Sequence, residues 1–145
     1  MLASRRMAYV DGEPVRVNAD SPGKKKMKLF LVEDSAIIRQ RLEMLVQGFP
    51  RIAITGQFET AGDAIQAIAQ APPDLILLDL ELGATSGLDV LRYTSRHFPN
   101  IKVIVLTNHC DARTRSQCLK AGAYLFLDKS LEFAKVTSAL QSIGP

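Results

Sequence analysis

The sequence has few cysteines and no long apolar run. Only Cys110 and Cys118 occur in 145 residues, which excludes a disulfide framework and a zinc site built from two cysteine pairs. No apolar stretch approaches the roughly 18 residues of a membrane span, and residues 1–27 lack the apolar core of a signal peptide. We therefore expect a protein of the reducing cytoplasm with no membrane segment.

Basic residues are in excess only near the N-terminus. Residues 1–27 carry six basic and three acidic side chains, which accounts for the net charge of +3, and the rest of the chain carries twelve of each sign. The body therefore has no basic footprint for direct nucleic-acid binding. Prolines and little apolar periodicity predict that residues 1–27 form a basic, mostly disordered extension. The length predicts one domain, over residues 28–145.

Short apolar runs alternate with helical patterns after this extension. The expected strands cover residues 28–32, 52–58, 75–78, 101–106 and 124–127, and the expected helices cover residues 36–47, 62–70, 88–97, 112–120 and 131–143. Ser35, Asp111 and Ser130 are the expected N-caps of three of these helices. Strict alternation predicts an α/β fold of three layers, a parallel sheet with helices on both faces. The flavodoxin-like strand order 2-1-3-4-5 fits five such units.

Polar residues follow four of the five expected strands. Glu33 and Asp34 follow the first, Asp79 the third, Thr107 the fourth and Lys129 the fifth. In the order 2-1-3-4-5 the first and third strands are neighbours, so the three carboxylates converge at the carboxyl edge of the sheet. Crowded carboxylates repel unless a cation lies among them, and oxygen ligands suit Mg²⁺. A carboxylate nucleophile, a metal, a lysine and a hydroxyl together predict a site that accepts a phosphoryl group.

At these positions the chain resembles the receiver domain of bacterial two-component response regulators, the CheY-like family. The resemblance covers residues 28–143. The matching segments are Phe30-Leu-Val-Glu-Asp-Ser35, Leu77-Leu-Asp-Leu-Glu-Leu82, Ser86-Gly-Leu88, Val105-Leu-Thr107 and Ala121-Gly-Ala-Tyr-Leu-Phe-Leu-Asp-Lys129.

The resemblance implies a phosphorelay protein with Mg²⁺ as its cofactor. Asp79 matches the residue that a histidine kinase or a histidine phosphotransfer protein phosphorylates. Glu33 and Asp34 match residues that hold Mg²⁺, together with Asp79 and the backbone carbonyl of Glu81. The chain is then a phosphoacceptor rather than a general enzyme, and it catalyses only its own phosphotransfer and autodephosphorylation.

The resemblance also implies a switch that reads the phosphoryl group. Lys129 and Thr107 match residues that contact this group, and Phe126 matches an aromatic residue that turns inward on activation. Side chains at Glu81 and His109 are expected to flank the phosphorylated residue and tune its lifetime. The expected output is binding to a target protein, or homodimerisation, through the fourth helix, the fifth strand and the fifth helix.

Four positions depart from the commonest pattern of the family. Glu33 replaces an aspartate, and Gly83 replaces a proline after the acceptor, which predicts a looser loop. Asn108 is larger than the usual residue beside Thr107. Ser130 replaces a proline after Lys129, and we expect the Lys129–Ser130 peptide to be trans, because a non-proline cis bond costs about 2.5–4 kcal/mol.

Two other functions are open at this stage. A phosphohydrolase of the haloacid dehalogenase type also uses a strand-end aspartate and Mg²⁺, and Asp79-Leu-Glu81 resembles its acid pair. Its nucleophile ends the first strand, however, and the connections here are too short for its cap. Alternatively, the chain is a receiver separated from a DNA-binding response regulator. The sequence names neither the cognate kinase nor the stimulus.

Overall fold

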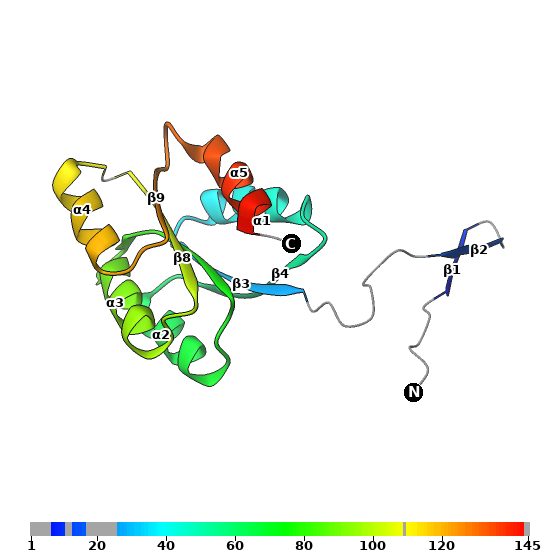
Figure 1. The fold of residues 1–145 in the computed structure, drawn as a ribbon, viewed down its shortest axis with the longest axis horizontal. Coiled ribbons are helices and arrows are strands. Elements are labelled where there is room, and N and C mark those ends of the chain that lie inside the picture. The colour runs from blue at the N-terminus through cyan, green and yellow to red at the C-terminus, as the bar shows by residue number, and fades with distance from the viewer. Residues whose placement is uncertain (1–6, 11–12, 17–25, 109, 144–145) are drawn as a thin grey trace.

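A five-stranded parallel sheet forms the centre of the protein (Figure 1). The computed structural model describes residues 7–10, 13–16, 26–108 and 110–143. The strand order is β4-β3-β5-β8-β9, which confirms the predicted order 2-1-3-4-5. In chain order these strands are β3 (Met27–Val32), β4 (Ile52–Phe58), β5 (Leu75–Leu78), β8 (Lys102–Thr107) and β9 (Leu125–Asp128).

Helices cover both faces of the sheet. They are α1 (Ala36–Gln47), α2 (Ala61–Gln70), α3 (Gly87–His97), α4 (Ala112–Lys120) and α5 (Phe133–Ile143). Helices α1 and α5 pack on one face, and α2, α3 and α4 pack on the other. None of the helices in the described ranges is long and apolar enough to cross a membrane.

The central strands are buried on both faces because their apolar residues are consecutive. Along β3, Phe30 and Val32 enter the core beneath α2 and α3, whereas Leu29 and Leu31 enter the core beneath α1 and α5. All four residues of β5 are likewise buried. Two hydrophobic cores therefore fix the register of the sheet, since a slip of one residue would exchange the two faces.

Capping residues set most of the helix boundaries. Ser35 caps α1 and Asp111 caps α4, as predicted, and Thr60 caps α2 one residue earlier than expected. Ser130 does not cap the last helix, so that prediction is wrong: α5 begins at Phe133. Asp128 Oδ1 instead accepts hydrogen bonds from the backbone N–H groups of Ser130 and Leu131 and holds this segment as a turn. Among the described residues no peptide is cis, which confirms the trans Lys129–Ser130 bond.

A short hairpin that the sequence did not predict follows β5. Strand β6 (Glu81–Leu82) pairs antiparallel with β7 (Thr85–Ser86). Gly83 occupies the turn with a φ of 61°, a left-handed conformation that favours glycine. Thr85 Oγ1 accepts a hydrogen bond from Ala61 N at 3.0 Å and donates one to Leu82 O at 2.9 Å, which ties the hairpin to the start of α2. The glycine therefore shapes an ordered turn here rather than a loose loop.

Two further strands lie in the N-terminal extension, where no regular structure was predicted. β1 (Met7–Val10) pairs antiparallel with β2 (Glu13–Arg16). Each strand has four residues, too few to show a periodic pattern in the sequence. Most of residues 1–25 lies outside the described ranges, so disorder of the extension as a whole stays a prediction.

Candidate functional site

The ends of β3 and β5 bring the predicted acidic residues together. The two strands pair in parallel, with Val32 opposite Leu78, so Glu33 and Asp79 leave the sheet side by side. Asp79 N donates to Val32 O at 2.9 Å and fixes this alignment. Glu33 is only 2% exposed and Asp79 only 6%, whereas Asp34 is exposed. Two of the carboxylates are therefore buried beneath the edge and the third faces solvent.

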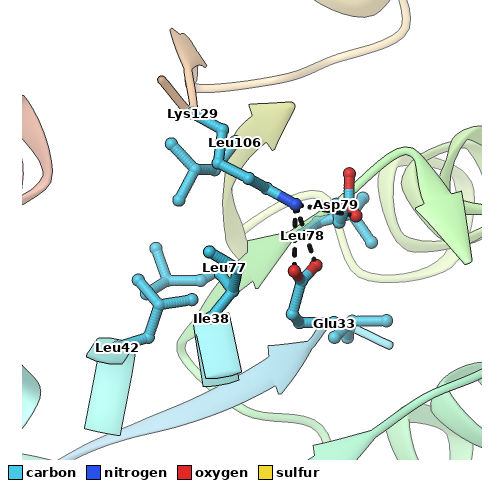
Figure 2. A pocket seen from close by; sticks show the side chains of 9 residues that line it. Glu33, Ile38, Leu42, Leu77, Leu78, Asp79, Leu106 and Lys129 are labelled. Atoms are coloured by element: carbon cyan, nitrogen blue, oxygen red, sulfur yellow. Dashed lines mark hydrogen bonds and ion pairs between the residues drawn. The ribbon is translucent and has the colours of Figure 1, made fainter. Parts of the chain in front are cut away.

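Lys129 connects the two buried carboxylates. Its Nζ lies 2.9 Å from Glu33 Oε1, 3.3 Å from Glu33 Oε2 and 3.0 Å from Asp79 Oδ2 (Figure 2). Strand β9 delivers this lysine, since Lys129 N donates to Thr107 O at 2.9 Å. The other oxygen of Asp79, Oδ1, accepts from Glu81 N at 3.2 Å. One ammonium group thus donates to both buried acids, which offsets part of the cost of burying them.

Burial changes the acid–base behaviour of this cluster. Desolvation and the neighbouring carboxylate of Asp79 raise the pKa of Glu33 to about 8, although Lys129 acts in the opposite direction. Desolvation acts to lower the pKa of Lys129, but hydrogen bonds to Glu33 and Asp79 outweigh it and raise that pKa overall. The lysine therefore stays protonated, and a further cation beside these carboxyl groups would favour the ionised form of Glu33.

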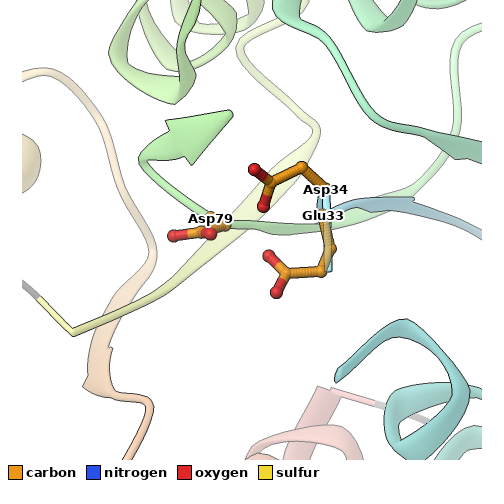
Figure 3. Close-up of side chains that lie close together, drawn as sticks. All are labelled: Glu33, Asp34 and Asp79. Carbon is orange, nitrogen blue, oxygen red and sulfur yellow. The ribbon is translucent and has the colours of Figure 1, made fainter. Parts of the chain in front are cut away.

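The three carboxylates are close enough to bind one metal ion. One oxygen from each of Glu33, Asp34 and Asp79 lies within 4.8 Å of the others. Figure 3 shows the three side chains gathered at the ends of β3 and β5. The donors are all oxygens, which suits a hard cation such as Mg²⁺. The predicted convergence of these three residues is therefore observed.

The predicted switch residues lie on the two strands beyond β5. Thr107 ends β8 at the same edge as Asp79 and is fully buried. Phe126, on β9, is 3% exposed, so its ring already points inward. The Arg115 guanidinium lies 5.9 Å from the centre of that ring, and its Nη1 donates to Phe126 O at 3.5 Å. Cys110 Sγ donates to Thr107 O at 3.0 Å, which links the β8–α4 connection to the same strand end.

The structure describes one of the two residues that were predicted to tune the lifetime of the phosphorylated state. Glu81 begins β6, two residues beyond Asp79, with an exposed side chain. His109 lies outside the described residues. Asn108, the larger residue beside Thr107, is exposed.

Sequence reasoning missed Arg39 as a part of this edge. Arg39 lies in α1, and its Nη1 donates to Glu33 O at 2.9 Å. The same atom pairs with Glu59 Oε1 at 3.1 Å. An arginine in the helix that follows an acid pair was the available signal, but its partners depend on where β4 ends in the fold.

Comparison with known proteins identifies the family and the fold. The family model of the response regulator receiver domain matches residues 29–141. The chain belongs to this family. A protein-glutamate methylesterase/protein-glutamine glutaminase 1 of Carboxydothermus hydrogenoformans is 36% identical over 119 residues, which are 80% of this chain and 34% of that protein. The DNA-binding transcriptional activator DevR/DosR of Mycobacterium tuberculosis is 24% identical over 118 residues, which are 81% of this chain and 54% of that protein.

Solved receivers share the fold. A two-component response regulator of the LuxR family from Aurantimonas superposes with a TM-score of 0.75 at 24% identity, covering 82% of this chain and 85% of that one. The response regulator domain of Thermotoga maritima CheB gives a TM-score of 0.70 at 24% identity, covering 82% and 93%. This receiver thus spans about a third to half of the length of the curated relatives given above. Its function is phosphorelay signalling in a two-component system.

Proposed function

We propose that this receiver accepts a phosphoryl group on Asp79 from a phosphohistidine of a histidine kinase or a histidine phosphotransfer protein. The observation that carries the proposal is the bridge of Lys129 Nζ between Asp79 and Glu33, at 3.0 and 2.9 Å, among buried acids at the carboxyl edge of the sheet. Both oxygens of Asp79 are held, Oδ2 by Lys129 Nζ and Oδ1 by Glu81 N, which fixes the carboxyl group in place for attack on phosphorus.

The chemistry is an exchange of one bond to phosphorus for another. A carboxylate oxygen of Asp79 attacks phosphorus, and a new O–P bond forms. The P–N bond of the donor breaks, and its electron pair stays on the imidazole nitrogen. Lys129 offsets the negative charge of the phosphoryl oxygens, and the Thr107 hydroxyl is placed to donate to one of them. Catalysis by this receiver is limited to its own phosphorylation and dephosphorylation.

The residues at this edge fit Mg²⁺. Asp34 and Asp79 would bind it through carboxylate oxygens, Glu33 through an oxygen or a bridging water, and Glu81 through its backbone carbonyl. When bound, Mg²⁺ supplies positive charge against the phosphoryl oxygens. Asp34, the exposed member of the group, would hold the ion from the solvent side, whereas the Glu33 carboxyl group is already engaged by Lys129.

Replacing Asp34 tests the metal site. We expect Asp34→Asn to weaken Mg²⁺ binding by about tenfold or more, because one of few charged ligands is lost. The same change leaves the apo protein equally or more stable, since it relieves repulsion among three carboxylates. Calorimetric Mg²⁺ titration and urea unfolding in EDTA measure the two effects. Equal Mg²⁺ affinity in the variant and the wild type would contradict the assignment.

The output of the site passes through Thr107, Phe126 and α4. Helix α4 contributes one fully buried side chain, Cys118, and Leu119 remains 43% exposed. A helix held by so little apolar contact moves at low cost. Its exposed side chains include Arg113, Arg115 and Lys120, of which Arg115 lies against Phe126 of β9, and such basic groups suit an acidic partner or a second copy of the chain.

Hydrogen exchange tests this route. Phosphorylation is expected to change amide exchange over residues 108–128, because the new charge draws the Thr107 hydroxyl and biases the packing of Phe126 and α4. The Thr107→Ala variant has no hydroxyl to respond and is expected to lose most of the change while still being phosphorylated. Mass spectrometry of exchange with and without phosphorylation measures it. An identical response in the variant places the switch elsewhere.

We further propose a cellular compartment for this chain and the kind of effector to which such a receiver would be attached. Both cysteines carry free thiols, which supports a reducing cytoplasm. One relative is a DNA-binding activator that extends well beyond the matched region. A receiver attached to such an effector would use the same α4–β9–α5 face, with nucleic acid bound by the effector rather than by this domain.

A further inference from the structure

Arg39 links the acidic loop to the neighbouring strand. Its Nη1 donates to the backbone carbonyl of Glu33 at 2.9 Å and pairs with Glu59 Oε1 at 3.1 Å. The Arg39 side chain is 19% exposed, whereas that of Glu59 is 63% exposed. The bond to the carbonyl is thus the more shielded of the two interactions, and a hydrogen bond from a charged donor is stronger than a neutral one.

The carbonyl that Arg39 holds belongs to the peptide joining Glu33 to Asp34. The N–H of Glu33 donates to Phe58 O at 2.9 Å, and its carboxylate contacts Lys129. With Arg39 on the carbonyl, Glu33 is fixed at its amide, its side chain and its carbonyl. Asp34 follows directly and has an exposed side chain. The direction in which Asp34 leaves the backbone therefore depends on the plane of the peptide that Arg39 fixes.

We propose that Arg39 is a positioning residue for the Mg²⁺ site, which it serves by holding the Glu33 carbonyl so that Asp34 stays directed toward Asp79. The inference rests on the proposed metal site. Partners that orient metal ligands from behind typically contribute about 10–100-fold to metal affinity. Arg39 itself bears a positive charge, so it cannot be a ligand. Its effect reaches the metal only through the backbone of the acid pair.

Glu59 provides a matched control. Glu59→Gln removes the charge of the ion pair but leaves the bond from Arg39 to Glu33 O. Exposed ion pairs contribute little. We expect Arg39→Ala to weaken Mg²⁺ binding by about tenfold, and Glu59→Gln to change it by less than about twofold. Calorimetric titration of the full chain with Mg²⁺ measures both, with Asp34→Asn as the variant that loses a ligand.

A kinetic readout separates positioning from a general loss of structure. With a small-molecule acyl phosphate as donor, the Mg²⁺ concentration for half-maximal phosphorylation of Arg39→Ala is expected to rise about tenfold. Its rate at saturating Mg²⁺ stays near that of the wild type, and its urea unfolding in EDTA, where bound Mg²⁺ cannot restore the fold, still shows a cooperative transition. Arg39→Lys keeps a donor on α1 and is expected to recover part of the affinity.

The outcomes distinguish the two proposals. If the wild type binds Mg²⁺, Asp34→Asn loses it and Arg39→Ala binds as tightly as the wild type, the positioning role is overturned and the metal site stands. Equal losses in Arg39→Ala and Glu59→Gln also overturn it, since the ion pair would then be responsible. If the wild type itself binds no Mg²⁺, the metal site falls and the role of Arg39 falls with it.

Discussion

Asp79→Asn is expected to abolish phosphorylation of the protein. With Mg²⁺ and a small-molecule acyl phosphate, the wild type gains one phosphoryl group, seen as a mass increase of the intact chain. The amide of asparagine is not a carboxylate nucleophile, so the variant gains none. This expectation follows from the proposed acceptor role of Asp79, whose Oδ2 lies 3.0 Å from Lys129 Nζ.

Asp74 provides the control for this result. It lies directly before β5, five residues ahead of Asp79, and its exposed carboxylate accepts a hydrogen bond from Lys28 N at 2.8 Å. Asp74→Asn keeps that acceptor oxygen, so both folding and phosphorylation are expected to match the wild type. Retained labelling of Asp79→Asn at the wild-type level would refute the acceptor assignment.

Replacing Lys129 is expected to change phosphotransfer and metal binding in opposite directions. Lys129→Met removes the cation that offsets the charge of the phosphoryl oxygens, and loss of one such group costs about 10²–10³-fold in rate. The same ammonium opposes a second cation at Asp79, so its removal strengthens Mg²⁺ binding by roughly tenfold. Labelling kinetics at saturating Mg²⁺ and calorimetric titration measure the two effects.

The opposite signs make the Lys129 result specific. A variant that merely lost structure would bind Mg²⁺ less tightly and react more slowly. Lys135 serves as the control, because it lies on the exposed surface of α5 and pairs with Glu132 within one turn. Lys135→Met is expected to leave both quantities unchanged. Weaker Mg²⁺ binding in Lys129→Met would show that the lysine supports the metal site rather than opposing it.

The sequence was sufficient to predict the sheet but not the short connections. Strand β5 was predicted correctly because its four consecutive apolar residues require burial on both faces of a sheet, a requirement that does not depend on the neighbouring elements. The start of α5 was predicted wrongly because Ser130 has the chemistry of a cap, yet its own hydroxyl donates to Asp128 Oδ1, as do the N–H groups of Ser130 and Leu131. Competition between two local hydrogen-bonding side chains is not visible in a periodic pattern.

The convergence of the acidic residues was predictable from the sequence, as the sheet was, but their side-chain contacts were not. Topology alone places Glu33, Asp34 and Asp79 at one edge, because strand order and parallel direction decide it. The sharing of Lys129 between two acids was not predicted, since it depends on side-chain length and burial. Arg39 was missed because its partners, Glu33 O and Glu59, are set by the ends of two neighbouring strands.

Gly87 decides which part of the receiver is free to move. A Cβ atom at this position would lie 2.1 Å from Asp79 O, so the first residue of α3 rests directly on the backbone of the acceptor. Gly87 N also donates to Leu80 O at 2.8 Å. We therefore expect the peptide that follows Asp79 to move together with α3 when the proposed phosphoryl group is added. Movement in response to that group falls to the opposite side of β8, where a single buried cysteine anchors α4.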